Sequence, residues 1–94
     1  MRCVITPRAN ADLGEIADHI AQDDPARALS FVQDLRERCM RLCAMPNAWP
    51  ARPRLGAGVR MAVSGRYLIF YRVEESRLLV LRILHGSRDI ERLF

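Results

Sequence analysis

The chain contains no lysine: all 15 of its strongly basic side chains are arginines. Schiff-base catalysis and P-loop phosphate binding both need a lysine, so these two kinds of chemistry are excluded. Arginine instead offers a planar, multidentate donor suited to carboxylates and phosphates. The charge is unevenly distributed. Residues 1–49 carry six arginines against seven acidic residues, whereas residues 50–94 carry nine against four. The second half is therefore the basic half.

Long apolar runs are also missing. No stretch is long enough to span a bilayer, and the segment Met1–Pro7 has no apolar run typical of a signal peptide. We therefore expect a cytoplasmic protein with no membrane contact. A length of 94 residues allows one domain, residues 1–94, built around one hydrophobic core.

Cysteine is scarce, and its number is odd. Three cysteines do not make a disulfide framework in an intracellular protein. Cys39 and Cys43 lie four residues apart, a spacing that places two ligands on one helix face, but no histidine or second cysteine pair stands nearby to complete a metal site. We interpret both as small apolar residues on a packed face, and expect no metal and no cofactor.

The first half of the chain predicts a short strand at Val4 and Ile5 followed by two helices. Thr6 is predicted to be the N-cap of a helix, with Pro7 at its first position. The helix is expected over residues 7–21. Its apolar residues recur at helical spacing, while three acidic residues fall on the other face: Asp12, Glu15 and Asp18.

Asp24 and Pro25 repeat the same cap and begin the second helix, which ends before Pro46. Its apolar positions again follow helical spacing: Ala28, Val32, Leu35, Cys39 and Leu42. On its exposed face we expect two ion pairs with the acid first, Asp34–Arg38 and Glu37–Arg41. Two amphipathic helices joined by a short turn predict a helical hairpin.

A loop rich in proline and glycine follows up to Gly58, and the apolar period then changes to two. Three strands are predicted, at Val59–Val63, Tyr67–Val73 and Leu78–His85. The fold class is therefore α+β with the order β-α-α-β-β-β, a helical hairpin packed on a small, mostly antiparallel sheet.

The last two strands are apolar on both faces, which a strand with water on one side does not need. In the strand at Tyr67–Val73, Leu68 and Phe70 are expected to point to the face opposite that of the other apolar residues. In the strand at Leu78–His85, the same is expected of Val80 and Leu84. The hairpin can cover only one face of the sheet. The other face is covered either by a partner, which we favour, or by the C-terminal segment folding back.

These residues resemble the ParE branch of the ParE/RelE toxins over essentially the whole chain. The matching features, in chain order, are Ala9 with Asp12-Leu13 and Ile16, Asp24-Pro25, Pro46, Gly58-Val59-Arg60, Tyr67-Leu68-Ile69-Phe70-Tyr71-Arg72-Val73 and His85-Gly86-Ser87-Arg88-Asp89-Ile90. The resemblance implies the toxin of a type II toxin–antitoxin module. Its partner would be a ParD-like ribbon-helix-helix antitoxin that covers the apolar sheet face, and its target DNA gyrase, inhibited without hydrolysis.

The related RelE toxins cleave messenger RNA on the ribosome, and their pattern is largely replaced here. Leu68 stands where RelE toxins have a strand arginine, and Phe94 where they have a terminal tyrosine. Val59 and Met61 replace their basic cluster, with Arg60 between, and only Arg88 is kept. Leucine cannot offset phosphate charge and phenylalanine has no proton to give. A nuclease with a rearranged site on His85 and Arg88, or a non-toxic homologue that only binds the antitoxin, remain the alternatives.

We assign no catalytic residue. His85 has no partnered nucleophile in the sequence, so we favour a packing or hydrogen-bonding role for it. Trp49 is interpreted as an anchor for the proline-rich loop. Target contact is expected from the basic half and the terminal segment: Arg60, Arg66, Arg88, Ile90, Leu93 and Phe94. Antitoxin contact is expected at the apolar sheet face: Leu68, Phe70, Val80 and Leu84.

Overall fold

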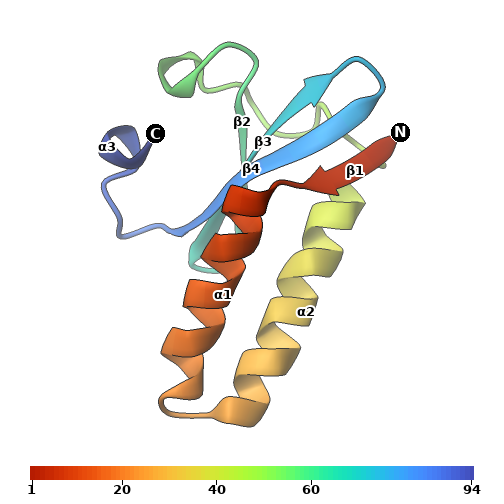
Figure 1. Ribbon diagram of the computed structural model, residues 1–94. Coiled ribbons are helices and arrows are strands. Elements are labelled where there is room, and N and C mark those ends of the chain that lie inside the picture. Colours follow the sequence, from red (N-terminus) through yellow and green to blue (C-terminus); the bar gives the residue numbers. More distant parts are fainter.

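The computed structural model of the protein describes all 94 residues (Figure 1). Its elements, in chain order, are β1 (Arg2–Ile5), α1 (Pro7–Ala21), α2 (Pro25–Leu42), the 3-10 turn η1 (Pro53–Leu55), β2 (Arg60–Ser64), β3 (Tyr67–Glu74), β4 (Arg77–His85) and α3 (Ile90–Leu93). The predicted α+β order is confirmed. The short elements η1 and α3 were not predicted.

The two long helices begin where their caps predict. The Thr6 hydroxyl accepts the Ala9 N–H at 3.2 Å, and the Asp24 carboxylate accepts the Arg27 N–H at 3.0 Å. A proline occupies the first turn of each helix, where its missing N–H costs nothing. In Figure 1 the helices run side by side as an antiparallel hairpin.

The predicted ion pairs on the surface of α2 do not form. The Asp34 carboxylate lies 3.9 Å from the guanidinium of Arg27, two turns before it, rather than beside Arg38. Arg41 and Glu37 are also unpaired with each other, because exposed side chains gain too little from such a contact to fix their rotamers. Arg38 and Arg41 therefore have no carboxylate partner.

The sheet has the strand order β1-β4-β3-β2, with β1 parallel to β4 and the other pairs antiparallel. The helical hairpin lies between β1 and β2 in the chain and packs on one face of the sheet. Along β3 the predicted alternation holds: Ile69 and Tyr71 join the core under the helices, whereas Phe70 points to the opposite face.

A β-bulge in β4 changes the alternation that its sequence predicts. Phe70 pairs with Arg82 and Tyr71 pairs with Val80, so Leu81 is an extra residue without a partner on β3. Val80 and Ile83 consequently both face the helices, although they are three residues apart. The placement of Val80 on the open face beside Leu84 is therefore wrong, because the bulge shifts the period between them.

The second sheet face is covered in part by the chain itself. Phe70 is 0% and Leu84 3% exposed, beneath a cover that includes Ile90 and Leu93 of α3. The ring of Phe94 lies 4.8 Å from that of Phe70, centroid to centroid. We expected a partner to cover this face, but the C-terminal segment of the chain itself covers this part of it. That expectation is wrong here. Three apolar residues on it remain half-buried: Met61, Leu68 and Leu81.

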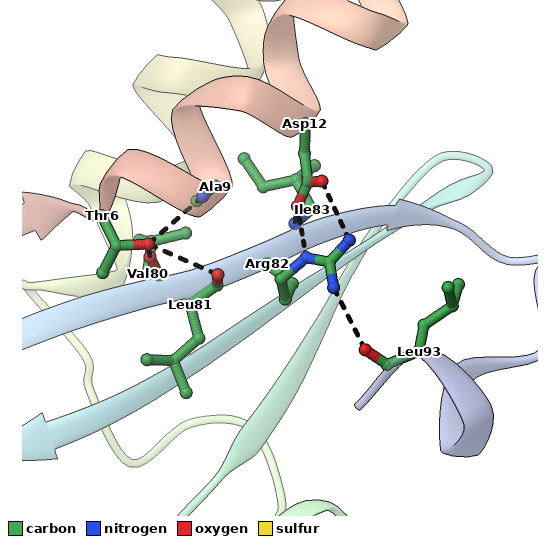
Figure 2. A network of polar contacts seen from close by, with 8 residues as sticks. All are labelled: Thr6, Ala9, Asp12, Val80, Leu81, Arg82, Ile83 and Leu93. Atoms are coloured by element: carbon green, nitrogen blue, oxygen red, sulfur yellow. Dashed lines mark hydrogen bonds and ion pairs between the residues drawn. The ribbon is translucent and has the colours of Figure 1, made fainter.

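Asp12 is buried, at 2% exposure, although its helix position predicts the solvent face. Beyond Val80, β4 no longer pairs with β1, so its backbone lacks acceptors from that strand. The Asp12 carboxylate replaces one of them by accepting the Ile83 N–H at 2.9 Å. Arg82 donates to the same carboxylate at 2.8 and 3.1 Å, and to the Leu93 carbonyl at 3.1 Å (Figure 2). These bonds to Asp12 raise the pKa of Arg82 further above its usual value. This network joins α1, β4 and α3.

No helix of this fold is both long and apolar enough to cross a bilayer. The three cysteines are free, and no group of three histidine, cysteine or acidic side chains is placed to hold a metal ion. Burial raises the pKa of Cys3 to about 12 and that of Cys39 to about 11. The thiols of Cys3 and Cys39 are therefore protonated, packed side chains at neutral pH.

Candidate functional site

The residues expected to contact a target lie in three separate places. Arg66 and Arg88 line one cavity between α1 and the ends of β3 and β4. Arg60 lies at the start of β2, where its guanidinium donates to the carbonyl of Trp49. The third group, Ile90, Leu93 and Phe94, lies on the second sheet face.

The cavity of Arg66 and Arg88 has a volume of about 600 Å³. Helix α1 forms one wall, which includes Glu15 and His19, and the ends of the two strands form the other. The Gly86 N–H donates to the carbonyl of Arg66 at 2.8 Å, which holds the two arginine-bearing segments together. Neither arginine has a carboxylate partner, so both guanidinium groups are available to an anionic ligand.

His85 lies in the same cavity with a partner that the sequence analysis missed. Its Nδ1 is 2.7 Å from the Ser87 hydroxyl and accepts the Ser87 N–H at 3.1 Å. An N–H can only donate, so Nδ1 is an acceptor and the neutral ring carries its proton on Nε2. The only signal in the sequence is the spacing His-x-Ser, which is also that of an ordinary hydrogen-bonded turn.

This geometry suits binding better than proton transfer. With Nδ1 occupied by Ser87, the neutral His85 ring presents Nε2–H, a donor rather than a base. The ring also stacks edge-on against Tyr67, with centroids 5.2 Å apart, which fixes its plane. The cavity therefore combines two free guanidinium groups with a hydrogen-bond donor.

The two positions where RelE toxins carry nuclease residues do not reach this cavity. Leu68 is on the second sheet face, packed against Phe70 and Leu84. Phe94 packs on the ring of Phe70 on that same face. Neither is among the residues that line the cavity of Arg66 and Arg88.

The residues expected to contact the antitoxin are mostly inaccessible. Phe70, Val80 and Leu84 are at most 3% exposed, and Val80 belongs to the core on the helix side. Leu68 alone is half-buried. The interpretation of Trp49 as a loop anchor is confirmed, because its side chain packs against the main core.

Comparison with known proteins identifies the family. The sequence model described as the ParE toxin of the type II toxin–antitoxin system parDE matches residues 3–90. A solved structure, the chromosomal ParDE TA system from P. aeruginosa, contains a chain that is 32% identical and superimposes with a TM-score of 0.80. The match covers 90% of this chain and 95% of that chain. No curated protein matches. The chain belongs to the ParE toxins of type II parDE toxin–antitoxin systems.

Proposed function

We propose that this toxin inhibits DNA gyrase by binding to it directly, without catalysis, until a ParD antitoxin neutralises it. The observation that carries the proposal is the cavity of Arg66 and Arg88, which has two free cations and whose His85 has its Nδ1 occupied by Ser87. Such a site is suited to hold a carboxylate or phosphate of a macromolecule.

The charge distribution supports the same proposal. Four of the nine arginines of the basic half form ion pairs: Arg72 and Arg77 contact Glu74, Arg82 contacts Asp12, and Arg54 contacts Glu91. Arg66 and Arg88 are exposed and unpaired. Exposed arginines are enriched among the residues that dominate binding energy in protein interfaces. Gyrase binds DNA, so its complex with DNA presents phosphates that free guanidinium groups can bind.

A supercoiling assay with purified gyrase tests the proposal. The wild-type toxin should inhibit supercoiling and stabilise cleaved DNA. The double variant Arg66→Ala/Arg88→Ala should need about 30- to 1,000-fold more protein for the same inhibition, given about 1–2 kcal/mol for each guanidinium. The control variant Arg2→Ala/Arg8→Ala removes the same charge from exposed positions on β1 and α1 and should inhibit like the wild type.

One observation favours a second candidate, ribosome-dependent cleavage of messenger RNA. The Ser87 hydroxyl and His85 Nδ1 are within hydrogen-bond distance beside Arg66 and Arg88. An in-vitro translation assay beside the gyrase assay separates the candidates. Cleavage of messenger RNA with gyrase unaffected would replace the gyrase proposal. Activity in neither assay would leave a homologue that serves only as the antitoxin's partner.

A further inference from the structure

The cavity of Arg66 and Arg88 is larger than a single anionic group needs. Its volume of about 600 Å³ lies inside the range of roughly 300–1,000 Å³ that is typical of sites for whole small molecules and cofactors. A lone carboxylate or phosphate would contact the two guanidinium groups and leave most of that space unfilled. The other walls of the cavity therefore indicate what else the ligand carries.

The wall at the ends of the strands is positive and rich in donors. Arg66 and Arg88 are exposed and form no ion pair. The bond from the Gly86 N–H to the Arg66 carbonyl, 2.8 Å long, keeps the two segments that carry them together. Beside them His85 presents Nε2–H, because Ser87 occupies its Nδ1. These donors suit the several oxygens of one phosphate.

The next part of the cavity wall is aromatic. Tyr67 and His85 both line the cavity, and their rings meet edge-on. Phe31 of α2 packs edge-on against Tyr67 with centroids 5.3 Å apart, so the tyrosine ring is held in place. Tyr67 is half-buried, which leaves part of its side chain open to a ligand. Proteins bind unpaired nucleotides with this combination, stacking the base on an aromatic ring and holding the phosphate with basic side chains.

The opposite wall, helix α1, is acidic. Glu15 is exposed, lines the cavity and forms no ion pair. Asp12 lines the cavity too, but Arg82 and the Ile83 N–H occupy its carboxylate. A free carboxylate repels phosphate and accepts hydrogen bonds from amino groups. The complementary ligand is therefore negative at the strand ends and carries a donor at α1, as does a nucleotide whose base has an amino group.

Building on the proposed gyrase function, we infer that this cavity holds one unpaired nucleotide of the DNA bound by gyrase. The phosphate lies on Arg66 and Arg88, the base packs on the Tyr67 ring, and the amino group of the base donates to Glu15. A paired base is stacked inside the duplex and cannot reach the ring. The cavity therefore selects single-stranded over duplex DNA. It also selects cytosine, which carries the N4 amino group, over thymine, which has the O4 acceptor there.

Binding of fluorescently labelled DNA oligonucleotides to the full toxin, followed by anisotropy, tests the inference. A single strand should bind at least about 10-fold more tightly than the same sequence in a duplex. Arg66→Ala/Arg88→Ala should weaken binding of the single strand at least about 10-fold. The matched control Arg2→Ala/Arg77→Ala removes the same charge at the other end of β4 and should bind within about twofold of the wild type.

The contacts to the base have their own variants. Tyr67→Leu removes the ring and should weaken binding at least about fivefold, whereas Tyr67→Phe keeps the ring and should bind like the wild type. Circular dichroism checks that both are folded. Because Glu15, Arg66 and Arg88 are exposed, their variants test the cavity even where Tyr67→Leu does not fold.

The preference for cytosine tests the contact with α1. The wild-type toxin should bind oligodeoxycytidine at least about threefold more tightly than oligothymidine. Glu15→Gln should abolish that preference, since an amide can also donate to thymine O4. Asp18→Asn, at an exposed acidic position of α1 outside the cavity, should retain it. Loss of negative charge alone would strengthen the binding of both oligonucleotides and leave their ratio unchanged.

Several outcomes would overturn the inference. Unchanged affinity of Arg66→Ala/Arg88→Ala, or of folded Tyr67→Leu, would exclude the cavity as the nucleotide site. Tighter binding of an RNA oligonucleotide of the same sequence would assign the cavity to messenger RNA instead. Gyrase inhibition without oligonucleotide binding would exclude the nucleotide and leave the gyrase proposal standing. Oligonucleotide binding without gyrase inhibition would remove the gyrase proposal and keep the nucleotide site.

Discussion

The Asp12–Arg82 pair is the contact whose removal should most destabilise the fold. Asp12 is 2% exposed and accepts three hydrogen bonds, two from Arg82 and one from the Ile83 backbone. The variant Asp12→Ala leaves the Arg82 guanidinium, whose side chain is only 12% exposed, without a counter-charge and with the Leu93 carbonyl as its remaining acceptor. It also leaves the buried Ile83 N–H without an acceptor. Breaking a buried pair in this way costs about 3–5 kcal/mol. For a chain of this length, that lowers the melting temperature by about 12–40 °C.

Urea unfolding followed by circular dichroism measures the change. Asp18→Ala, an exposed acidic position on the same helix, is the matched control and should stay within about 0.5 kcal/mol of the wild type. The double variant Asp12→Ala/Arg82→Met should be more stable than Asp12→Ala, because it removes the uncompensated charge. A loss below about 1 kcal/mol for Asp12→Ala would refute the reasoning that this pair is desolvated.

Three further predictions concern individual contacts. Tyr71→Phe removes a buried hydroxyl that donates to the Pro46 carbonyl at 2.8 Å, and should cost about 1–2 kcal/mol in urea unfolding; wild-type stability would contradict it. Because burial raises the pKa of Cys3 to about 12 and of Cys39 to about 11, both thiols should be alkylated by iodoacetamide at pH 8 far more slowly than after unfolding, by mass spectrometry. Phe94→Ala should cost about 1 kcal/mol and increase binding of a hydrophobic dye, since its ring covers Phe70; unchanged dye binding would argue against this cover.

The helical hairpin could be predicted because its signals are local. Thr6 and Asp24 each cap a helix through a backbone N–H three residues ahead, a contact that sequence spacing specifies. The faces of β3 were also predictable, since a regular strand alternates without exception. These features need no knowledge of distant residues.

The bulge at Leu81 and the burial of Asp12 depend on contacts far apart in the chain. Asp12 reaches Arg82 across 70 residues, and its position on α1 looks like any other acidic residue on a solvent face. The bulge reverses the faces of β4 after Val80, so the open face predicted from alternation included the wrong residue. The pairing of His85 with Ser87 is local, but the sequence alone cannot tell it from a common turn.

The position of Arg66 connects two hollows of the surface. It lines both the cavity shared with Arg88 and a second hollow of about 380 Å³, whose lining also includes Arg38 of α2 and Tyr67. An antitoxin that covers the second hollow would also cover a guanidinium that the proposed target binding needs, and would neutralise the toxin by direct competition. Arg66→Ala should weaken binding to both antitoxin and gyrase, whereas Arg88→Ala should weaken gyrase binding alone. In a pull-down with immobilised gyrase, saturating antitoxin should release the toxin. A stable complex of all three would show that the two surfaces do not overlap.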